Sequence, residues 1–263
     1  MSLARVYSYI DSQRENFLKD LFQLLKQRSI STQNDGIQEC AELLATQMRE
    51  VGIKTTIFPT NRHPVVYGEI GPNEGPVMLI YGHYDVQPPE PLELWDSDPF
   101  NPVIRDGKIF ARGSSDNKGQ LFAHVKAIQA YQEVLGQLPL KVKFIFEGEE
   151  EISSPSLEPF VSTHKELLQT DICIFSDSHV QENGRPLVVL GLKGMLYVQI
   201  TLKGANRDLH SMRAASVPSP VWRLVHLLSG LKGEDGLVRI PGFYEDVREL
   251  LPEEIAAVEK IPC

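Results

Sequence analysis

A continuously apolar run from Val77 to Tyr81 constrains the fold of this chain more than any other segment. A strand with one wet face alternates apolar and polar residues, whereas an uninterrupted apolar run is typical of a strand buried on both faces. Later segments of strand length and helix length alternate: strands at 140–146 and 172–175, and helices at 117–135 and 156–168. This order predicts an α/β fold with a mixed, mainly parallel sheet sandwiched by helices.

The segments around this run add further elements to the same layer arrangement. Helical spacing of apolar residues predicts two amphipathic helices before the first strand. Alternation of apolar and polar residues predicts an edge strand next to a second strand, and an Asp-Gly pair predicts a tight hairpin. The expected elements are helices at 17–25 and 37–51, strands at 53–57 and 65–70, and a hairpin at 104–109.

The pattern changes near residue 186, which predicts two domains. Residues 1–185 form the larger domain, and residues 186–263 form the beginning of a smaller α+β domain. In the smaller domain we expect strands at 188–190 and 196–202 and helices at 221–231 and 252–260.

Composition excludes several classes of partner. The formal net charge of the 263 residues is −9 and the sequence pI is about 5.3, which argues against nucleic acid or an anionic membrane surface. The longest apolar run, Val77 to Tyr81, is too short to span a bilayer. Three cysteines without metal-like spacing (Cys40, Cys173 and Cys263) favour a reducing compartment. We therefore expect a cytoplasmic protein that binds neither nucleic acid nor membrane.

Five short segments carry the candidate chemistry. Ligands of parallel sheets gather at the carboxyl ends of the strands, which is where His83, Glu150, Glu151 and Asp177 fall. Carboxylates and imidazoles bind divalent cations, and one further acid can serve as a base. The five segments are Gly82–Asp85, Gly113–Gly119, Glu147–Glu151, Ser176–Ser178 and Asp208–Ser211.

Each segment also has a plain structural interpretation. His83 and Asp85 could form a capped strand end, and Asp116 could be a helix N-cap. Asp177 and His210, each taken alone, are ordinary loop or surface residues. The glutamates could form a solvated loop, although such a cluster repels itself unless a cation or a shared proton is present. The remaining histidines have no ligand-like partner and are interpreted as structural: His63, His124, His164, His179 and His226.

The order, spacing and flanking residues of these segments resemble those of one enzyme family over roughly residues 10 to 260. It is the co-catalytic metallopeptidase family that contains carnosine dipeptidases, bacterial dipeptidases, glutamate carboxypeptidases and acylamino-acid deacylases. The resemblance is greatest to the dipeptidase branch, and it implies a zinc-exopeptidase-like catalytic domain at 1–185 with a lid or dimerisation domain at 186–263. The segments that carry it are Tyr81–Pro88, Trp95–Phe100, Ala111–Gly119, Glu147–Ser154 and Asp208–Ser211.

The resemblance implies a pair of divalent metal ions and their ligands. His83 and Asp177 would hold one ion, Glu151 would hold the other, and Asp116 would bridge both. Zinc is the first choice, with manganese or cobalt as alternatives because the ligand set is rich in oxygen. The bridging aspartate commonly precedes a cis peptide, which here would join Asp116 to Asn117.

The resemblance also implies three catalytic side chains. Glu150 would be the general base that activates water, and Asp85 would orient the metal-binding histidine. His210 resembles a lid histidine that reaches the site of the partner subunit in a homodimer and stabilises the oxyanion.

The chain departs from the family pattern in two places. Family members continue beyond this length and take a second histidine ligand from the later segment, so we expect a C-terminally truncated chain. After His210 they are also rich in glycine, where this chain has Met212–Ser216.

These observations leave three functional hypotheses. The first is metal-dependent hydrolysis of the amide bond of dipeptides or short peptides. The second is an N-acyl amino acid deacylase or desuccinylase, and the third is an inactive metal-binding fragment that lacks the C-terminal ligand.

Overall fold

The computed structural model describes residues 3–180, 184, 187, 189 and 194–261. The chain divides into two compact units, Met1–Val188 and Val189–Cys263. The helices are α1 (Leu3–Ser12), α2 (Arg14–Lys26), α3 (Ile37–Glu50), α4 (Lys118–Leu135), α5 (Leu157–Thr163), α6 (Pro220–Leu231) and α7 (Pro252–Val258). The strands are β1 (Lys54–Phe58), β2 (Val65–Ile70), β3 (Val77–His83), β4 (Val103–Arg105), β5 (Lys108–Phe110), β6 (Lys141–Glu147) and β7 (Ile172–Phe175). Single 3-10 turns are η1 (Ser31–Gln33), η2 (Leu92–Leu94), η3 (Glu150–Ile152) and η4 (Ser211–Arg213).

A five-stranded sheet in the order β1-β2-β6-β3-β7 forms the centre of the first unit. The strands β6, β3 and β7 run parallel, and β2 is antiparallel to both β1 and β6. The predicted mixed, mainly parallel sheet is therefore confirmed, with β1 at an edge as expected. The predicted hairpin is also confirmed, because β4 and β5 pair through a turn in which Asp106 and Gly107 both have positive φ.

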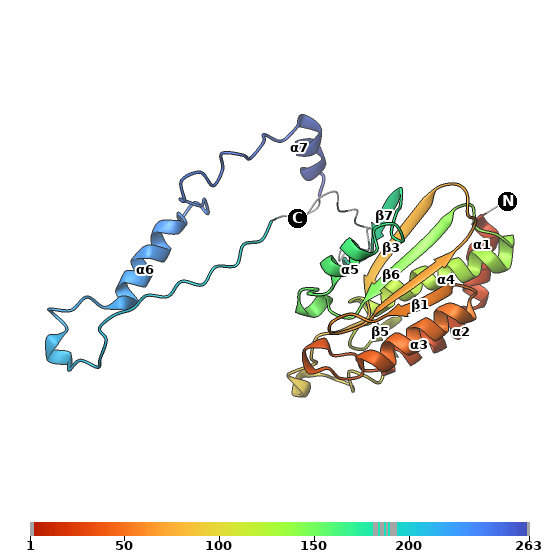
Figure 1. Ribbon diagram of the computed structural model, residues 1–263, viewed down its shortest axis with the longest axis horizontal. Coiled ribbons are helices and arrows are strands. Elements are labelled where there is room, and N and C mark those ends of the chain that lie inside the picture. Colours follow the sequence, from red (N-terminus) through yellow and green to blue (C-terminus); the bar gives the residue numbers. More distant parts are fainter. Residues whose placement is uncertain (1–2, 181–183, 185–186, 188, 190–193, 262–263) are drawn as a thin grey trace. The chain divides into compact units, whose positions relative to one another are not determined.

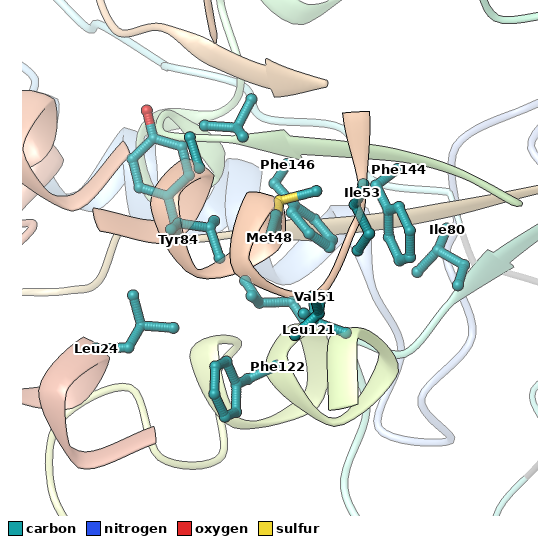
Figure 2. Close-up of a cluster of buried hydrophobic side chains, with 14 of the residues drawn as sticks. Leu24, Met48, Val51, Ile53, Ile80, Tyr84, Leu121, Phe122, Phe144 and Phe146 are labelled. Carbon is teal, nitrogen blue, oxygen red and sulfur yellow. The ribbon is translucent and has the colours of Figure 1, made fainter. Parts of the chain in front are cut away.

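Two apolar cores lie on opposite faces of the sheet. Figure 1 shows helices on both sides of the sheet, so the α/β sandwich is confirmed. The larger core lies between the sheet and α2, α3 and α4, and Figure 2 shows side chains from these helices meeting those of the strands. Each fully buried Leu, Ile or Phe there contributes about 1.5–3 kcal/mol relative to exposure. The smaller core lies under α5 and contains Val65, Tyr67, Leu79, Ile145, Phe160 and Leu168.

The position of β3 between β6 and β7 explains why its sequence lacks polar interruptions. Leu79 belongs to the smaller core and Ile80 to the larger one, so successive residues are buried on opposite faces. Because β6 and β7 flank β3 on both sides, its carboxyl end lies in the interior of the sheet.

Two expectations about the elements were wrong, and one helix was missed. Residues 196–202 are not a strand: their alternating apolar residues have no sheet partner in the described part of the chain, and Leu196 is 84% exposed. The helix α1 was not foreseen. The helix expected at 156–168 ends at Thr163, and the freed carbonyls of Leu167 and Gln169 accept hydrogen bonds from Nζ of Lys143.

The other expectations in the second unit have mixed outcomes. The helices expected at 221–231 and 252–260 are present as α6 and α7. The strand expected at 188–190 lies largely outside the described residues. No helix among the described residues combines the length and apolar character needed to cross a membrane.

Candidate metal centre

The candidate site begins at the carboxyl end of β3. His83 is the last residue of this strand, has a fully buried side chain and stands opposite Glu147 in the parallel ladder to β6. On the other side, the ladder from β3 to β7 ends at Tyr81 and Phe175. Since parallel strands end at the same edge, the residues that follow β6 and β7 are carried to the imidazole of His83.

The carboxylate of Asp85 fixes the imidazole and the neighbouring loop together. Nδ1 of His83 lies 3.1 Å from the backbone oxygen of Asp85 and 3.3 Å from its Oδ1. The same carboxylate accepts backbone N–H bonds from Glu150 at 3.2 Å and Glu151 at 3.1 Å. Nε2 of His83 is consequently left to face the acidic side chains, which is the arrangement that a metal-binding histidine requires.

Four carboxylates gather around Nε2 of His83. It lies 3.0 Å from Oδ1 of Asp116, 3.6 Å from Oδ2 of Asp177 and 3.9 Å from Oε2 of Glu150. His83, Asp116 and Glu151 each offer a ligand atom, and these atoms lie within 4.8 Å of one another. Within the part of the chain that the structure describes, this is the one such group of three or more potential metal ligands.

The protonation of the cluster reflects its crowding. Burial opposes a charge on His83, but hydrogen bonds to Asp116 and Asp85 and the nearby carboxylates raise its pKa to about 11. The hydrogen bond from His83 in turn lowers the pKa of Asp116. Burial, together with neighbouring carboxylates, raises the pKa of Glu150 and of Glu151. The metal-free cluster therefore holds a proton where a divalent cation would balance the charge, so the donor set fits such an ion.

The glutamates expected to crowd one strand end separate into two groups. Glu150 and Glu151 face the cluster, whereas Glu149 is buried and accepts backbone bonds from His63 at 2.7 Å and Ser156 at 2.8 Å. Glu149 therefore ties two loops together.

Glu147 is also buried, and it forms a separate polar network. Its Oε1 accepts hydrogen bonds from the Tyr81 hydroxyl at 2.7 Å and the Ser154 hydroxyl at 2.9 Å. Sequence patterning alone did not separate Glu147 and Glu149 from the two site residues.

Gln87 is a polar residue of the site that the sequence interpretation passed over. Its Nε2 donates to Oε2 of Glu151 at 2.8 Å, so it orients that carboxylate. The spacing of His83, Asp85 and Gln87 contained the signal, because residues two apart in an extended chain point to the same side.

The peptide between Asp116 and Asn117 is cis, as the family resemblance implied.

His210 lies exposed in the second unit, where its Nδ1 accepts a hydrogen bond from the backbone N–H of Met212 at 3.2 Å. Its role in a partner's site stays a prediction. Of the histidines interpreted as structural, His63 is buried and bonded to Ser31, and His124 contacts the Ser176 hydroxyl at 2.7 Å.

The fold and this cluster of ligands define a metallopeptidase-like catalytic domain. Residues 79–257 match the model of peptidase family M20/M25/M40, and the chain belongs to that family. The family resemblance inferred from the sequence motifs is thus confirmed, and membership implies divalent-metal cofactors.

Individual relatives agree with this assignment. The Cys-Gly metallodipeptidase of Schizosaccharomyces pombe is 31% identical over 272 residues, which cover 97% of this chain and 57% of that protein. The solved structure of an M20 family metallo-carboxypeptidase, Sso-CP2 from Sulfolobus solfataricus, is 41% identical, with a TM-score of 0.86 over 94% of this chain and 56% of that one. Human carnosine dipeptidase 1 is 27% identical, with a TM-score of 0.72 over 100% of this chain and 59% of that one. The chain thus spans just over half the length of the relatives it matches.

Proposed function

We propose that the protein hydrolyses the amide bond of dipeptides or short peptides in a metal-dependent reaction. The observation that carries the proposal is the group of His83, Asp116 and Glu151, with the carboxylate of Glu150 beside it. Metal-dependent amide hydrolysis requires side chains that bind the metal and one further side chain that acts as a general base. The similarity to proteins named metallodipeptidase and carnosine dipeptidase supports the substrate class.

The ligand assignment is the one that the family resemblance implies, and the short distances around His83 support it. His83 and Asp177 would hold one divalent ion, Glu151 a second, and Asp116 would be shared between them. We propose zinc, with manganese or cobalt as alternatives for this oxygen-rich set. When bound, such ions polarise a substrate carbonyl and lower the pKa of water toward neutrality.

Glu150 is the proposed general base. It takes a proton from the attacking water and returns it to the leaving amine. Its raised pKa, caused chiefly by burial, suits this role because a base works best when its pKa lies near the working pH. Asp85 does not touch substrate in this scheme and acts by holding His83 and the backbone of Glu150.

The proposal extends to the second unit as a lid and dimerisation domain. His210 would contact the oxyanion in the site of a partner chain, so the protein would act as a homodimer. We also propose a reducing, cytoplasmic location, in line with Cys40 and Cys173, which form no disulfide within the described part of the chain.

A second candidate reaction is release of the C-terminal residue from longer or N-blocked peptides. The 41% identity to a metallo-carboxypeptidase favours it. Both reactions use the same ligands and base, and they differ in whether a free substrate amine is needed.

Hydrolysis by the purified 263-residue chain tests the proposal. The chain would be stripped with a chelator, reloaded with zinc, manganese or cobalt, and offered Cys-Gly, β-Ala-His, an N-blocked dipeptide and an N-acyl amino acid, with bound metal counted. Metal-restored turnover of the free dipeptides supports the dipeptidase, and turnover of only the N-blocked dipeptide supports the carboxypeptidase. Turnover of only the N-acyl amino acid supports the deacylase. Metal binding without any turnover supports a non-catalytic metal-binding chain.

A further inference from the structure

The side chain of Asn117 is buried at the centre of the site although it is not among the proposed ligands. It is 1% exposed, and both the oxygen and the nitrogen of its amide form hydrogen bonds. Oδ1 accepts the backbone N–H of His83 at 3.3 Å, and Nδ2 donates to the backbone oxygen of Ser176 at 3.1 Å and to Oδ1 of Asp177 at 3.3 Å.

The Asn117 amide connects the segments after β3 and β7 at the point where the hydrogen-bonded ladder between these strands ends. The last paired residues of β3 and β7 are Tyr81 and Phe175, so no ladder bond holds His83 and Asp177 at a fixed separation. Asn117 bridges the two segments beyond that point, because it bonds to both of them.

Gly82 provides the space that the amide occupies. A Cβ at position 82 would lie 2.8 Å from Oδ1 of Asn117 and 3.0 Å from Cβ of Leu121. Oδ1 is the tip of the Asn117 side chain, but three hydrogen bonds hold that side chain in place, so a larger residue at position 82 would have to displace the amide.

The helix α4, which begins after Asn117, contacts the Ser176–Asp177 segment at a second point. His124 in α4 lies 2.7 Å from the Ser176 hydroxyl, while Asn117 at the N-terminus of α4 bonds to the backbone oxygen of Ser176. Asp177 therefore follows a residue that is held from two sides.

We propose that Asn117 is a positioning residue that aims the carboxylate of Asp177 at a divalent cation shared with His83. Its bond to Oδ1 of Asp177 leaves Oδ2, which lies 3.6 Å from Nε2 of His83, free to act as a ligand. The inference rests on the proposed metal-dependent function and assigns a residue that orients one of its ligands. Partners of this kind typically account for 10–100-fold in metal affinity.

A double-mutant cycle on Zn²⁺ binding tests the proposal. Asn117→Ala, Asp177→Ala and the double variant would be titrated with Zn²⁺ in competition with a chromogenic chelator, and thermal unfolding would be followed in parallel. We expect Asn117→Ala to weaken Zn²⁺ binding about 10–100-fold, and the double variant to bind no more weakly than Asp177→Ala alone. Gln47→Ala is the matched control, because Gln47 is another buried amide, and its Nε2 donates to the backbone oxygen of Asp20 instead of to a proposed ligand.

Gly82→Ala provides a second route that changes no polar atom. It should also weaken Zn²⁺ binding, since the new methyl group displaces the amide of Asn117. The proposal is overturned if the Asn117 and Asp177 effects add, or if Asn117→Ala and Gly82→Ala lower the melting temperature as Gln47→Ala does while Zn²⁺ affinity stays at the parent value. Because the readout is metal affinity, a chain that binds Zn²⁺ but hydrolyses no peptide leaves this inference standing and overturns only the proposed function.

Discussion

Asp85 and His83 form a buried pair in which one carboxylate performs two tasks. Oδ1 of Asp85 lies 3.3 Å from Nδ1 of His83, and the two carboxylate oxygens also accept the backbone N–H groups of Glu150 and Glu151. The position of the imidazole and the position of the acidic loop are therefore coupled through a single side chain. This coupling makes Asp85 the most informative residue to change outside the ligands.

Asp85→Asn should weaken divalent-metal binding about 10–100-fold. The amide keeps the size of the carboxylate, but its NH₂ group cannot accept a backbone N–H bond and no longer favours the metal-binding tautomer of His83. Zn²⁺ affinity measured against a competing chelator would show this loss. Asp96→Asn serves as the control, because the Asp96 side chain is 82% exposed and pairs with Arg105 of the β4–β5 hairpin instead of with a proposed ligand. Equal affinities of Asp85→Asn and the parent chain would contradict the prediction.

Replacing the two adjacent glutamates should have different consequences. Glu150→Gln should retain bound metal and lower turnover about 10²–10⁴-fold, since it removes the proposed base. Glu151→Gln should lower the metal content, because Glu151 belongs to the group of ligand atoms within 4.8 Å. Metal counting by atomic emission beside kcat on a dipeptide separates the two effects. If both variants lost metal to the same extent, Glu150 would be a ligand and the assignment of the base would be wrong.

The sequence was informative wherever the chemistry depended on local spacing. The apolar run of β3 placed His83 at the end of a buried strand, and two-residue spacing placed Asp85 beside it. Local spacing could not separate Glu149 from Glu150, and only the family resemblance assigned Glu150 a role, because their positions depend on bonds to His63 and Asp85, which are more than 60 positions away.

The false strand at 196–202 has a different cause. Alternation of apolar and polar residues shows that a segment suits a sheet face, but a strand also needs a partner for its backbone groups. Leu196 and Val198 are 84% and 69% exposed, and the described residues provide no such partner.

Metal binding to the metal-free chain should strengthen as pH rises. The pKa of His83 is raised to about 11, so at neutral pH the imidazole carries a proton that an incoming cation must displace. Loss of one proton predicts an affinity that increases about tenfold per pH unit between pH 7 and 9. Calorimetric titrations with Zn²⁺ in buffers of different ionisation enthalpy would measure the released proton directly.

A variant of a second histidine rules that histidine out as the source of the proton. His124→Gln should leave the proton release unchanged, because burial lowers the pKa of His124 and keeps its imidazole neutral. An affinity that did not vary with pH would show that His83 is already neutral in the metal-free chain.

Glu147 should make the metal-free chain less stable as pH rises from 4.5 to 7. Burial raises its pKa to about 7 from the usual 4.5, and bonds from Tyr81 and Ser154 only partly offset this. Below pH 4.5 the carboxyl is protonated in both states and costs nothing. Between the two values the unfolded chain releases a proton that the folded chain keeps, so the free energy of unfolding falls, by about 3 kcal/mol at most over the whole window.

Glu147→Gln removes this contribution, and urea unfolding at pH 4.5, 6 and 7.5 should show a smaller decline for the variant than for the parent. Glu74→Gln, at an exposed position, should follow the parent curve. Parallel curves for Glu147→Gln and the parent would mean that Glu147 is ionised in the folded chain throughout this range.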